Sequence, residues 1–241
     1  MDTSQNASLS IKSWPEKERP RERLAYLGPA ALSDAELLAI LLRNGVRGLD
    51  VMALARMLLK EAGDLRGLLR WDFKRLRAFK GLGPAKAAGL LAAFEFYRRA
   101  LREDALDHPV IRDPDAVVRY LAGALGEQPR EIFKVLFLNK ANQIIDEQDL
   151  FHGTIDQASV YPREVVKAAL DRHATALILA HNHPSGRLEP SPEDLALTRR
   201  LQEACRTVGV SILDHLIIAR NRYLSFREQG LMPGAEALKE T

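Results

Sequence analysis

The sequence lacks the features that mark several classes of protein. Its 241 residues include a single cysteine, Cys205, which excludes an internal disulfide and a cysteine-based zinc knuckle. Its apolar runs are all shorter than a membrane-spanning helix requires. The polar start, residues 1–23, has no apolar core of a secretory signal. We therefore expect a cytoplasmic protein with no membrane partner.

Neither sign of charge dominates the whole chain, whose net charge is +3. The two parts differ, however. Residues 1–104 hold 19 basic and 13 acidic side chains (net +6), and residues 105–241 hold 16 and 19 (net −3). A basic half is typical of nucleic-acid binding, but a solvated surface explains the same charge. On charge alone we favour the solvated surface.

Composition shifts and proline positions divide the chain into five segments. We expect an N-terminal arm over residues 1–23, a helical domain over 24–104, a linker over 105–115, an α/β domain over 116–226 and a C-terminal tail over 227–241. The length allows one large domain or two ordinary ones. We place the domain boundary near residue 105.

The periodicity of apolar residues changes at this boundary. The first part has helical spacing, with a helix that begins at a capping box, Ser33–Glu36, and stops at Asn44-Gly45. Further helices are expected over residues 50–62, 65–70 and 87–101. The second part predicts a mixed sheet flanked by helices. Its strands are expected over residues 133–138, 143–145, 150–155, 174–180 and 211–219, and its helices over 162–171 and 192–208.

The stretch FKGLGPAK, residues 79–86, has the form helix, Gly-x-Gly turn, helix. This helix-hairpin-helix pattern lets the backbone at Gly81 and Gly83 approach a DNA phosphate, and Lys80 and Lys86 would add positive charge. An ordinary helical hairpin, whose glycines only permit a tight turn, explains the pattern equally well.

The stretch HNHPSGRLEPSPED, which begins at His181, concentrates metal-ligand side chains. Side chains alternate along a strand, so His181 and His183 should point the same way. Ser191 is a favourable helix N-cap, which places Asp194 in the first helical turn. Two imidazoles and a carboxylate suit one Zn²⁺ per chain and leave a fourth position for water. Ser191 and Asp194 could instead only cap the helix, but the joint spacing favours a metal site.

This stretch, with ALILAHNHPSG and ILDHLIIA around it, resembles the RadC family. RadC proteins are similar to the JAMM, or MPN-plus, metalloproteases, whose signature is an upstream glutamate and then His-x-His-x7-Ser-x-x-Asp. The resemblance implies an MPN/JAMM, cytidine-deaminase-like α/β domain preceded by an all-α domain. Asn182 departs from the Ser or Thr usual in the proteases, which bears on substrate preference more than on metal binding.

The resemblance also implies a zinc-dependent hydrolase that cleaves a peptide or isopeptide bond in a protein or peptide substrate. Its general base would be Glu131 or Glu164, and we choose Glu131 because it precedes the first expected strand. Ser191 would donate to the oxyanion. His215 is either a partner of a ligand or a packed core residue.

The alternative function is a DNA-associated protein. It would bind DNA through the helical domain, with or without metal-dependent nuclease activity, and RadC proteins have carried a DNA-repair label. A purely structural zinc is disfavoured, because such sites usually have four protein ligands and the sequence offers three. The sequence names neither the substrate nor the oligomeric state.

Overall fold

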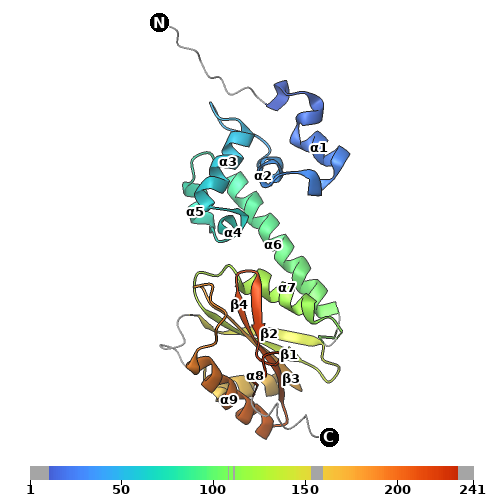
Figure 1. Cartoon of the computed structure of the whole chain (residues 1–241), viewed down its shortest axis with the longest axis vertical. Helices are drawn as coiled ribbons and strands as arrows, with labels where there is room; N and C mark the ends of the chain where they lie inside the picture. The colour runs from blue at the N-terminus through green and yellow to red at the C-terminus, as the bar shows by residue number, and fades with distance from the viewer. Residues whose placement is uncertain (1–10, 108, 111, 153–159, 233–241) are drawn as a thin grey trace. The chain divides into compact units, whose positions relative to one another are not determined.

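The computed structural model divides the chain into two compact units, Met1–Phe96 and Tyr97–Thr241. Figure 1 shows the elements in chain order. The parts of the chain that the structure describes are residues 11–107, 109–110, 112–152 and 160–232. The first ten residues of the predicted arm, the end of the strand predicted over 150–155 and the last nine residues of the predicted tail therefore lie outside the described residues.

The first unit is helical in its described part. Its elements are three short 3-10 turns (Ile11–Ser13, Glu16–Glu18 and Pro29–Ala31), α1 (Pro20–Leu27), α2 (Asp34–Leu42), α3 (Val51–Ala62), α4 (Leu65–Leu69), α5 (Phe73–Ala78) and the first half of α6 (Pro84–Asp107). The capping box predicted at Ser33 and Glu36 is present, and aspartates cap α3, α4 and α5. Leucines at helical spacing, such as Leu54, Leu58 and Leu76, form the buried core.

Three features of this unit differ from the prediction. The sequence indicates no helix within residues 11–23, whereas this part of the arm forms 3-10 turns and the start of α1, and Trp14 packs against the core. The bounds of α5, the helix before the Gly-x-Gly turn, were not predicted, since only Leu76 among its six residues is buried. Helix α6 continues to Asp107 rather than ending at 101, because residues 102–107 contain neither proline nor glycine. The division between the two compact units lies after Phe96, within α6, upstream of the boundary that the sequence places near residue 105.

The second unit has a mixed sheet, as predicted, and in the described residues its five strands have the order β2-β1-β3-β4-β5. The strands are β1 (Ile132–Leu138), β2 (Ile144–His152), β3 (Ala176–Asn182), β4 (Ser211–Ala219) and β5 (Arg222–Ser225). Strands β3 and β4 are parallel and the other neighbours are antiparallel. The helices are α7 (Pro114–Leu125), α8 (Pro162–Asp171) and α9 (Pro192–Thr207).

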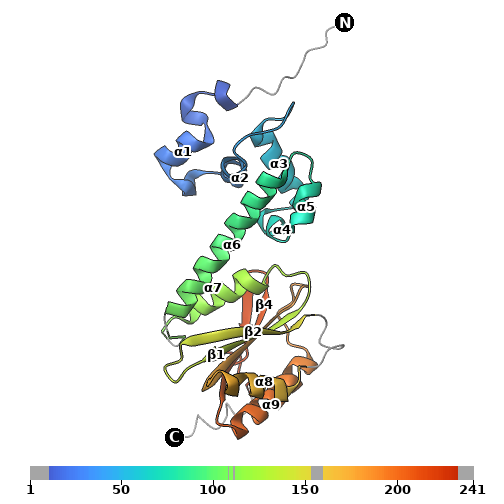
Figure 2. The same cartoon turned by 180° about the vertical axis from the view of Figure 1, so that it is seen from behind.

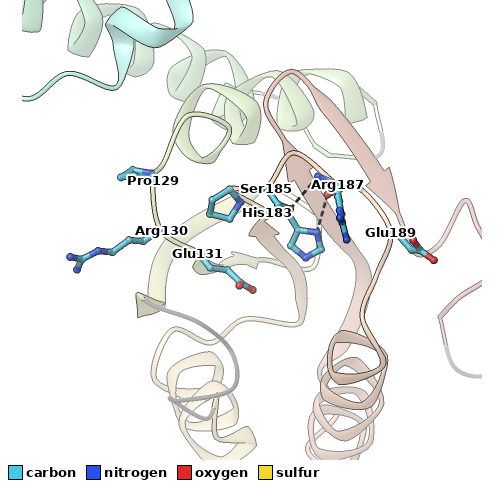
Figure 3. Close-up of a pocket in the computed structure, with 8 residues that line it drawn as sticks. Pro129, Arg130, Glu131, His183, Ser185, Arg187 and Glu189 are labelled. Atoms are coloured by element: carbon cyan, nitrogen blue, oxygen red, sulfur yellow. Dashed lines mark hydrogen bonds between the residues drawn. The ribbon is translucent and has the colours of Figure 1, made fainter. Parts of the chain in front are cut away.

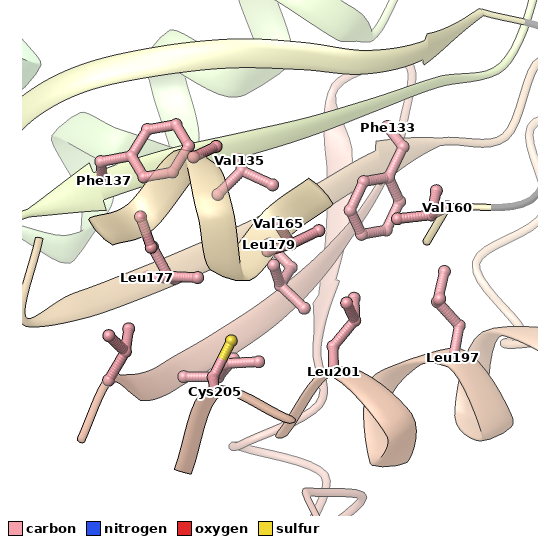
Figure 4. Close-up of a cluster of buried hydrophobic side chains, with 14 of the residues drawn as sticks. Phe133, Val135, Phe137, Val160, Val165, Leu177, Leu179, Leu197, Leu201 and Cys205 are labelled. Carbon is pink, nitrogen blue, oxygen red and sulfur yellow. The ribbon is translucent and has the colours of Figure 1, made fainter. Parts of the chain in front are cut away.

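Helices cover both faces of this sheet (Figures 1 and 2). Because side chains alternate along a strand, Phe133, Val135 and Phe137 of β1 pack with α8 and α9 on one face (Figure 4). Leu136 and Leu138 pack with α7 on the other face. Strands β1 and β3 are buried along their whole length, so the residues at their ends are held by a rigid sheet.

Two strand predictions and the predicted tail need correction. The strands predicted over 143–145 and 150–155 are one strand, β2, because the charged run between them lies on an edge strand where charge is solvated. The short strand β5 was not predicted. Leu231 and Met232, placed in the tail by the sequence, pack against the core of the α8 and α9 face. No helix among the described residues is long and apolar enough to cross a membrane.

Candidate metal centre

His181 and His183 lie at the carboxyl end of β3. The alternation of side chains predicts that they point the same way, and their Nε2 atoms are 3.0 Å apart. His181 is fully buried, whereas His183, one residue beyond the strand, is partly exposed. The two histidines therefore present a pair of ring nitrogens at the edge of the core.

Asp194 approaches these nitrogens from the first turn of α9. Its Oδ1 is 3.3 Å from His181 Nε2 and its Oδ2 is 3.6 Å from His183 Nε2. Ser191 is the N-cap, and it forms a capping box with Asp194. The Ser191 hydroxyl donates to Asp194 Oδ2 at 2.7 Å and accepts from the Asp194 amide at 3.1 Å. The hydrogen bonds that cap α9 therefore also hold the Asp194 carboxylate in place.

Glu131 completes the group from a segment 50 residues upstream of His181. Strand β1 runs antiparallel to β3 with Phe133 opposite His181, so the residue that precedes β1 lies beside the end of β3. Figure 3 shows the Glu131 side chain extending toward the side on which His183 lies. One ligand atom from each of Glu131, His181, His183 and Asp194 lies within 4.8 Å of the others.

The donor atoms of this cluster fit a cation. His183 Nδ1 lies 2.9 Å from the Arg187 carbonyl, which only accepts, so Nδ1 carries the hydrogen and Nε2 of the neutral ring presents a lone pair. Asp194 Oδ1 is buried and accepts no hydrogen bond from the described residues, although His181 Nε2 is 3.3 Å away. Lone pairs that converge in this way require a positive charge between them.

The pKa shifts in the cluster come from burial and from the contacts among its side chains. Burial raises the pKa of Asp194, but its contacts with His181, His183 and Ser191 outweigh burial and hold the pKa below the usual range of a carboxyl. Burial lowers the pKa of His181. The hydrogen bond to Asp194 raises the pKa of His183 against its partial burial. A proton on His183 and a metal ion would therefore compete for the same lone pair.

Asn182 points to the other side of β3, as predicted, and contacts the segment that carries Glu131. Its side-chain Oδ1 accepts from the Ile132 amide at 2.8 Å. Its Nδ2 donates to the carbonyls of Arg130 at 3.1 Å and Gln128 at 3.4 Å. Backbone groups on both sides of Glu131 are thus held by one buried amide. The sequence did not reveal this contact, because the partners are 50 to 54 residues apart.

Two further side chains, those of His215 and Thr198, form a hydrogen-bonded chain that starts at Nδ1 of His181. His215 Nε2, on β4, is 2.8 Å from His181 Nδ1, and His215 Nδ1 is 2.6 Å from the Thr198 hydroxyl on α9. Both residues are buried. The sequence left the role of His215 open and gave no role to Thr198. The sequence feature that could have pointed to His215 is a histidine within the largely apolar strand ILDHLIIA.

A cavity of about 690 Å³ opens beside the cluster (Figure 3). Glu131 and His183 contribute to its wall, together with Pro129, Arg130, Pro184, Ser185, Arg187 and Glu189. A bound molecule in this cavity would contact the proposed base and one of the proposed ligands at the same time.

Glu164, the other candidate base, lies elsewhere. It is exposed in the first turn of α8, and its carboxylate pairs with the neighbouring Arg163 at 3.2 Å. Of the two glutamates that the sequence left open, the fold brings Glu131 to the histidines.

The hairpin residues of the first unit have largely structural surroundings. Gly81 has a φ of +103°, and a Cβ there would lie 2.7 Å from a methyl carbon of Leu54. Lys86 donates to the carbonyls of Gly45 at 3.2 Å and Gly81 at 3.4 Å, and burial lowers its pKa. Lys80 is exposed. Gly83 is also exposed, and a Cβ there would meet no described atom within 4 Å. The Lys86 ammonium thus holds the turn together rather than standing free for a phosphate.

The mixed sheet and its cluster define a JAB-type domain, the fold of JAMM metal-dependent hydrolases. The RadC-like JAB domain family matches residues 111–231, and the UPF0758 N-terminal family matches residues 11–88. The chain therefore belongs to the RadC-like UPF0758 family.

Relatives of this family match nearly the whole chain. A UPF0758 protein of Neisseria meningitidis serogroup B is 49% identical over 225 residues, which is 93% of this chain and 100% of the relative. One from Methylibium petroleiphilum is 51% identical over 222 residues, 92% of this chain and 100% of the relative. One from Marinobacter nauticus is 50% identical over 224 residues, again 93% and 100%. Both units therefore have counterparts in these proteins.

Proposed function

We propose that the chain is a zinc-dependent hydrolase that cleaves a peptide or isopeptide bond. The observation that carries the proposal is the convergence of Glu131, His181, His183 and Asp194 within 4.8 Å beside a cavity. Three of these residues can act as ligands, and the fourth, Glu131, is a carboxylate that the fold brings to the same point from the segment before β1. This division of roles is typical of a catalytic rather than a structural zinc site.

His181, His183 and Asp194 would hold the metal. Two imidazoles with one carboxylate favour Zn²⁺ over Mg²⁺ or Ca²⁺, which prefer oxygen ligands. A bound zinc lowers the pKa of a coordinated water to near 7 and polarises a carbonyl oxygen.

Glu131 would accept the proton from the attacking water and then deliver it to the leaving amine. Its backbone is fixed by Asn182, so the carboxylate approaches the cluster from a constant direction. Ser191 would donate to the oxyanion, for which its hydroxyl must leave Asp194 Oδ2. The cavity wall formed by Glu131 and His183 would seat the peptide or protein substrate.

Metal content tests the site. The purified full chain should bind about one zinc, and His181→Ala and Asp194→Ala should lose it. His173→Asn is the matched control, because His173 is exposed and has a φ of 53°, which asparagine tolerates. Elemental analysis after dialysis measures the stoichiometry. Full zinc content in the two alanine variants would contradict the assignment.

Peptide cleavage tests the reaction. The zinc-loaded chain is incubated with a proteome-derived peptide library, and new N-termini are identified by mass spectrometry. We expect products that are absent with Asp194→Ala. Identical products from both proteins, or none from either, would argue against the peptidase reaction while leaving the zinc site intact.

DNA binding through the first unit is a second candidate function. Its supporting observation is a set of exposed cations on α5 and the turn that follows it, namely Lys74, Arg75, Arg77 and Lys80. Binding to single-stranded or branched DNA, followed by fluorescence anisotropy, should weaken as salt rises. Lys80→Glu should weaken it further, and unchanged binding would remove the hairpin from this role.

A further inference from the structure

The back of the proposed zinc site contains a chain of hydrogen bonds that ends on a metal ligand. It runs from His181 through His215 to Thr198 and then to the carbonyl of Asp194. The residues come from β3, β4 and α9, and all of these side chains are buried. The chain therefore joins two of the proposed zinc ligands through groups that solvent does not reach.

The direction of each hydrogen bond follows from Thr198. A hydroxyl has one hydrogen, and Thr198 donates it to the Asp194 carbonyl at 2.7 Å. Thr198 can then only accept from His215 Nδ1, 2.6 Å away, so Nδ1 of His215 carries a hydrogen. Full burial disfavours a charged ring, so His215 is neutral and its Nε2 presents a lone pair.

The same reasoning fixes His181. The His215 Nε2 lone pair is 2.8 Å from His181 Nδ1, so His181 Nδ1 must donate. His181 is then neutral with its hydrogen on Nδ1, and its Nε2 lone pair faces His183 and Asp194. This is the form of imidazole that can bind a metal through Nε2.

We propose that Thr198 and His215 are positioning residues that set the tautomer of His181 and so make its Nε2 available to zinc. The inference rests on the proposed zinc site. The arrangement differs from a ligand histidine that donates to a carboxylate or carbonyl, because its acceptor is a second imidazole with two tautomers of its own. Thr198 is therefore needed to select the tautomer of His215.

Zinc affinity separates this role from simple packing. Thr198→Val keeps the shape of the side chain but removes the hydroxyl, whereas Thr198→Ser keeps the hydroxyl. In competition with a chromophoric chelator, the full chain with Thr198→Val should bind Zn²⁺ about 10 to 100 times more weakly. Thr198→Ser should keep the wild-type affinity. Equal affinity of wild type and Thr198→Val would overturn the proposal.

The tautomer itself can be observed without metal. Two-bond proton–nitrogen NMR spectra of the metal-free, histidine-labelled chain should show the hydrogen of His181 on Nδ1, and in Thr198→Val it should shift to Nε2. A wild-type His181 with its hydrogen on Nε2 overturns the proposal. Because this spectrum needs no zinc, a wild-type chain that fails to bind zinc refutes the proposed function alone.

A second pair of variants covers the case in which Thr198→Val does not fold, which circular dichroism would show. His215→Gln keeps an acceptor near the position of Nε2, and His215→Met fills similar space without a comparable acceptor. We expect His215→Gln to retain most of the zinc affinity and His215→Met to lose it. Equal affinities in this pair would overturn the proposal.

Discussion

The sequence marks two short motifs, the His181–Asp194 stretch in the second unit and the Gly-x-Gly turn in the first. Their side chains have different surroundings in the fold. In the cluster, the side chains of His181, His183 and Asp194 converge on a point where a cation fits. In the turn, the hydrogens of Lys86 already contact two backbone carbonyls. A polar motif indicates a ligand-binding role when its donors and acceptors converge without enough partners in the fold. It indicates a structural role when the fold already supplies those partners.

The largest expected effect concerns the proposed base. Glu131→Gln should lower the turnover of a cleaved peptide by about 10²- to 10⁴-fold, because a neutral amide cannot accept the proton. Zinc content should remain at the wild-type level. Glu164→Gln is the control and should change neither, since Glu164 is exposed on α8. Turnover is measured by chromatography of the peptide products. Equal turnover of wild type and Glu131→Gln would show that this carboxylate belongs to the cluster without acting as base.

The second largest effect is expected from substitution of Asn182. Asn182→Leu should lower turnover and cost about 1–3 kcal/mol of unfolding free energy, because the Ile132 amide would be buried without an acceptor. Zinc affinity should change little, since the side chain points away from the histidines. Asn182→Thr, which keeps an acceptor, should lie between wild type and leucine. Denaturant unfolding and zinc competition measure the two quantities. A large loss of zinc affinity in Asn182→Leu would contradict a role confined to the Glu131 segment.

Substitution of Ser191 tests whether the N-cap of α9 also supports the proposed zinc site. Ser191→Ala removes the N-cap of α9 and should lower the unfolding free energy by about 1 kcal/mol. It should also lower zinc affinity, because the hydroxyl that holds Asp194 Oδ2 is lost. Ser191→Thr keeps both contacts and serves as the control. Thermal unfolding and chelator competition report the two effects, and an unchanged zinc affinity would separate the cap from the site.

The smallest effect is expected in the turn. Lys86→Met should lower the unfolding free energy by about 1 kcal/mol through the loss of its hydrogen bonds to Gly45 and Gly81. Lys80→Met should leave stability unchanged, because Lys80 is exposed. Denaturant unfolding of the two variants decides between them. If Lys86→Met is as stable as wild type, the contrast between the turn and the cluster fails.

Much of the second unit could be predicted because local rules suffice there. Alternation along β3 places His181 and His183 on one side, and Ser191 with Pro192 starts α9. The mistakes arose where local patterns were weak. The charged run in β2 suggested a break, because only the sheet order shows that β2 is an edge strand. The end of α6 was placed too early, because the pattern gave no clear stop signal.

The sequence by itself determined which residues could bind a metal ion. Spacing of two and thirteen residues from His181 is short enough for a strand end and a helix cap to bring His183 and Asp194 together. The tertiary structure alone decided the rest. It brought Glu131 rather than Glu164 to the histidines, set Asn182 of β3 against the segment before β1, and placed His215 and Thr198 behind His181. These contacts join residues separated by 17 to 54 positions, and only sheet pairing and helix packing fix such distances.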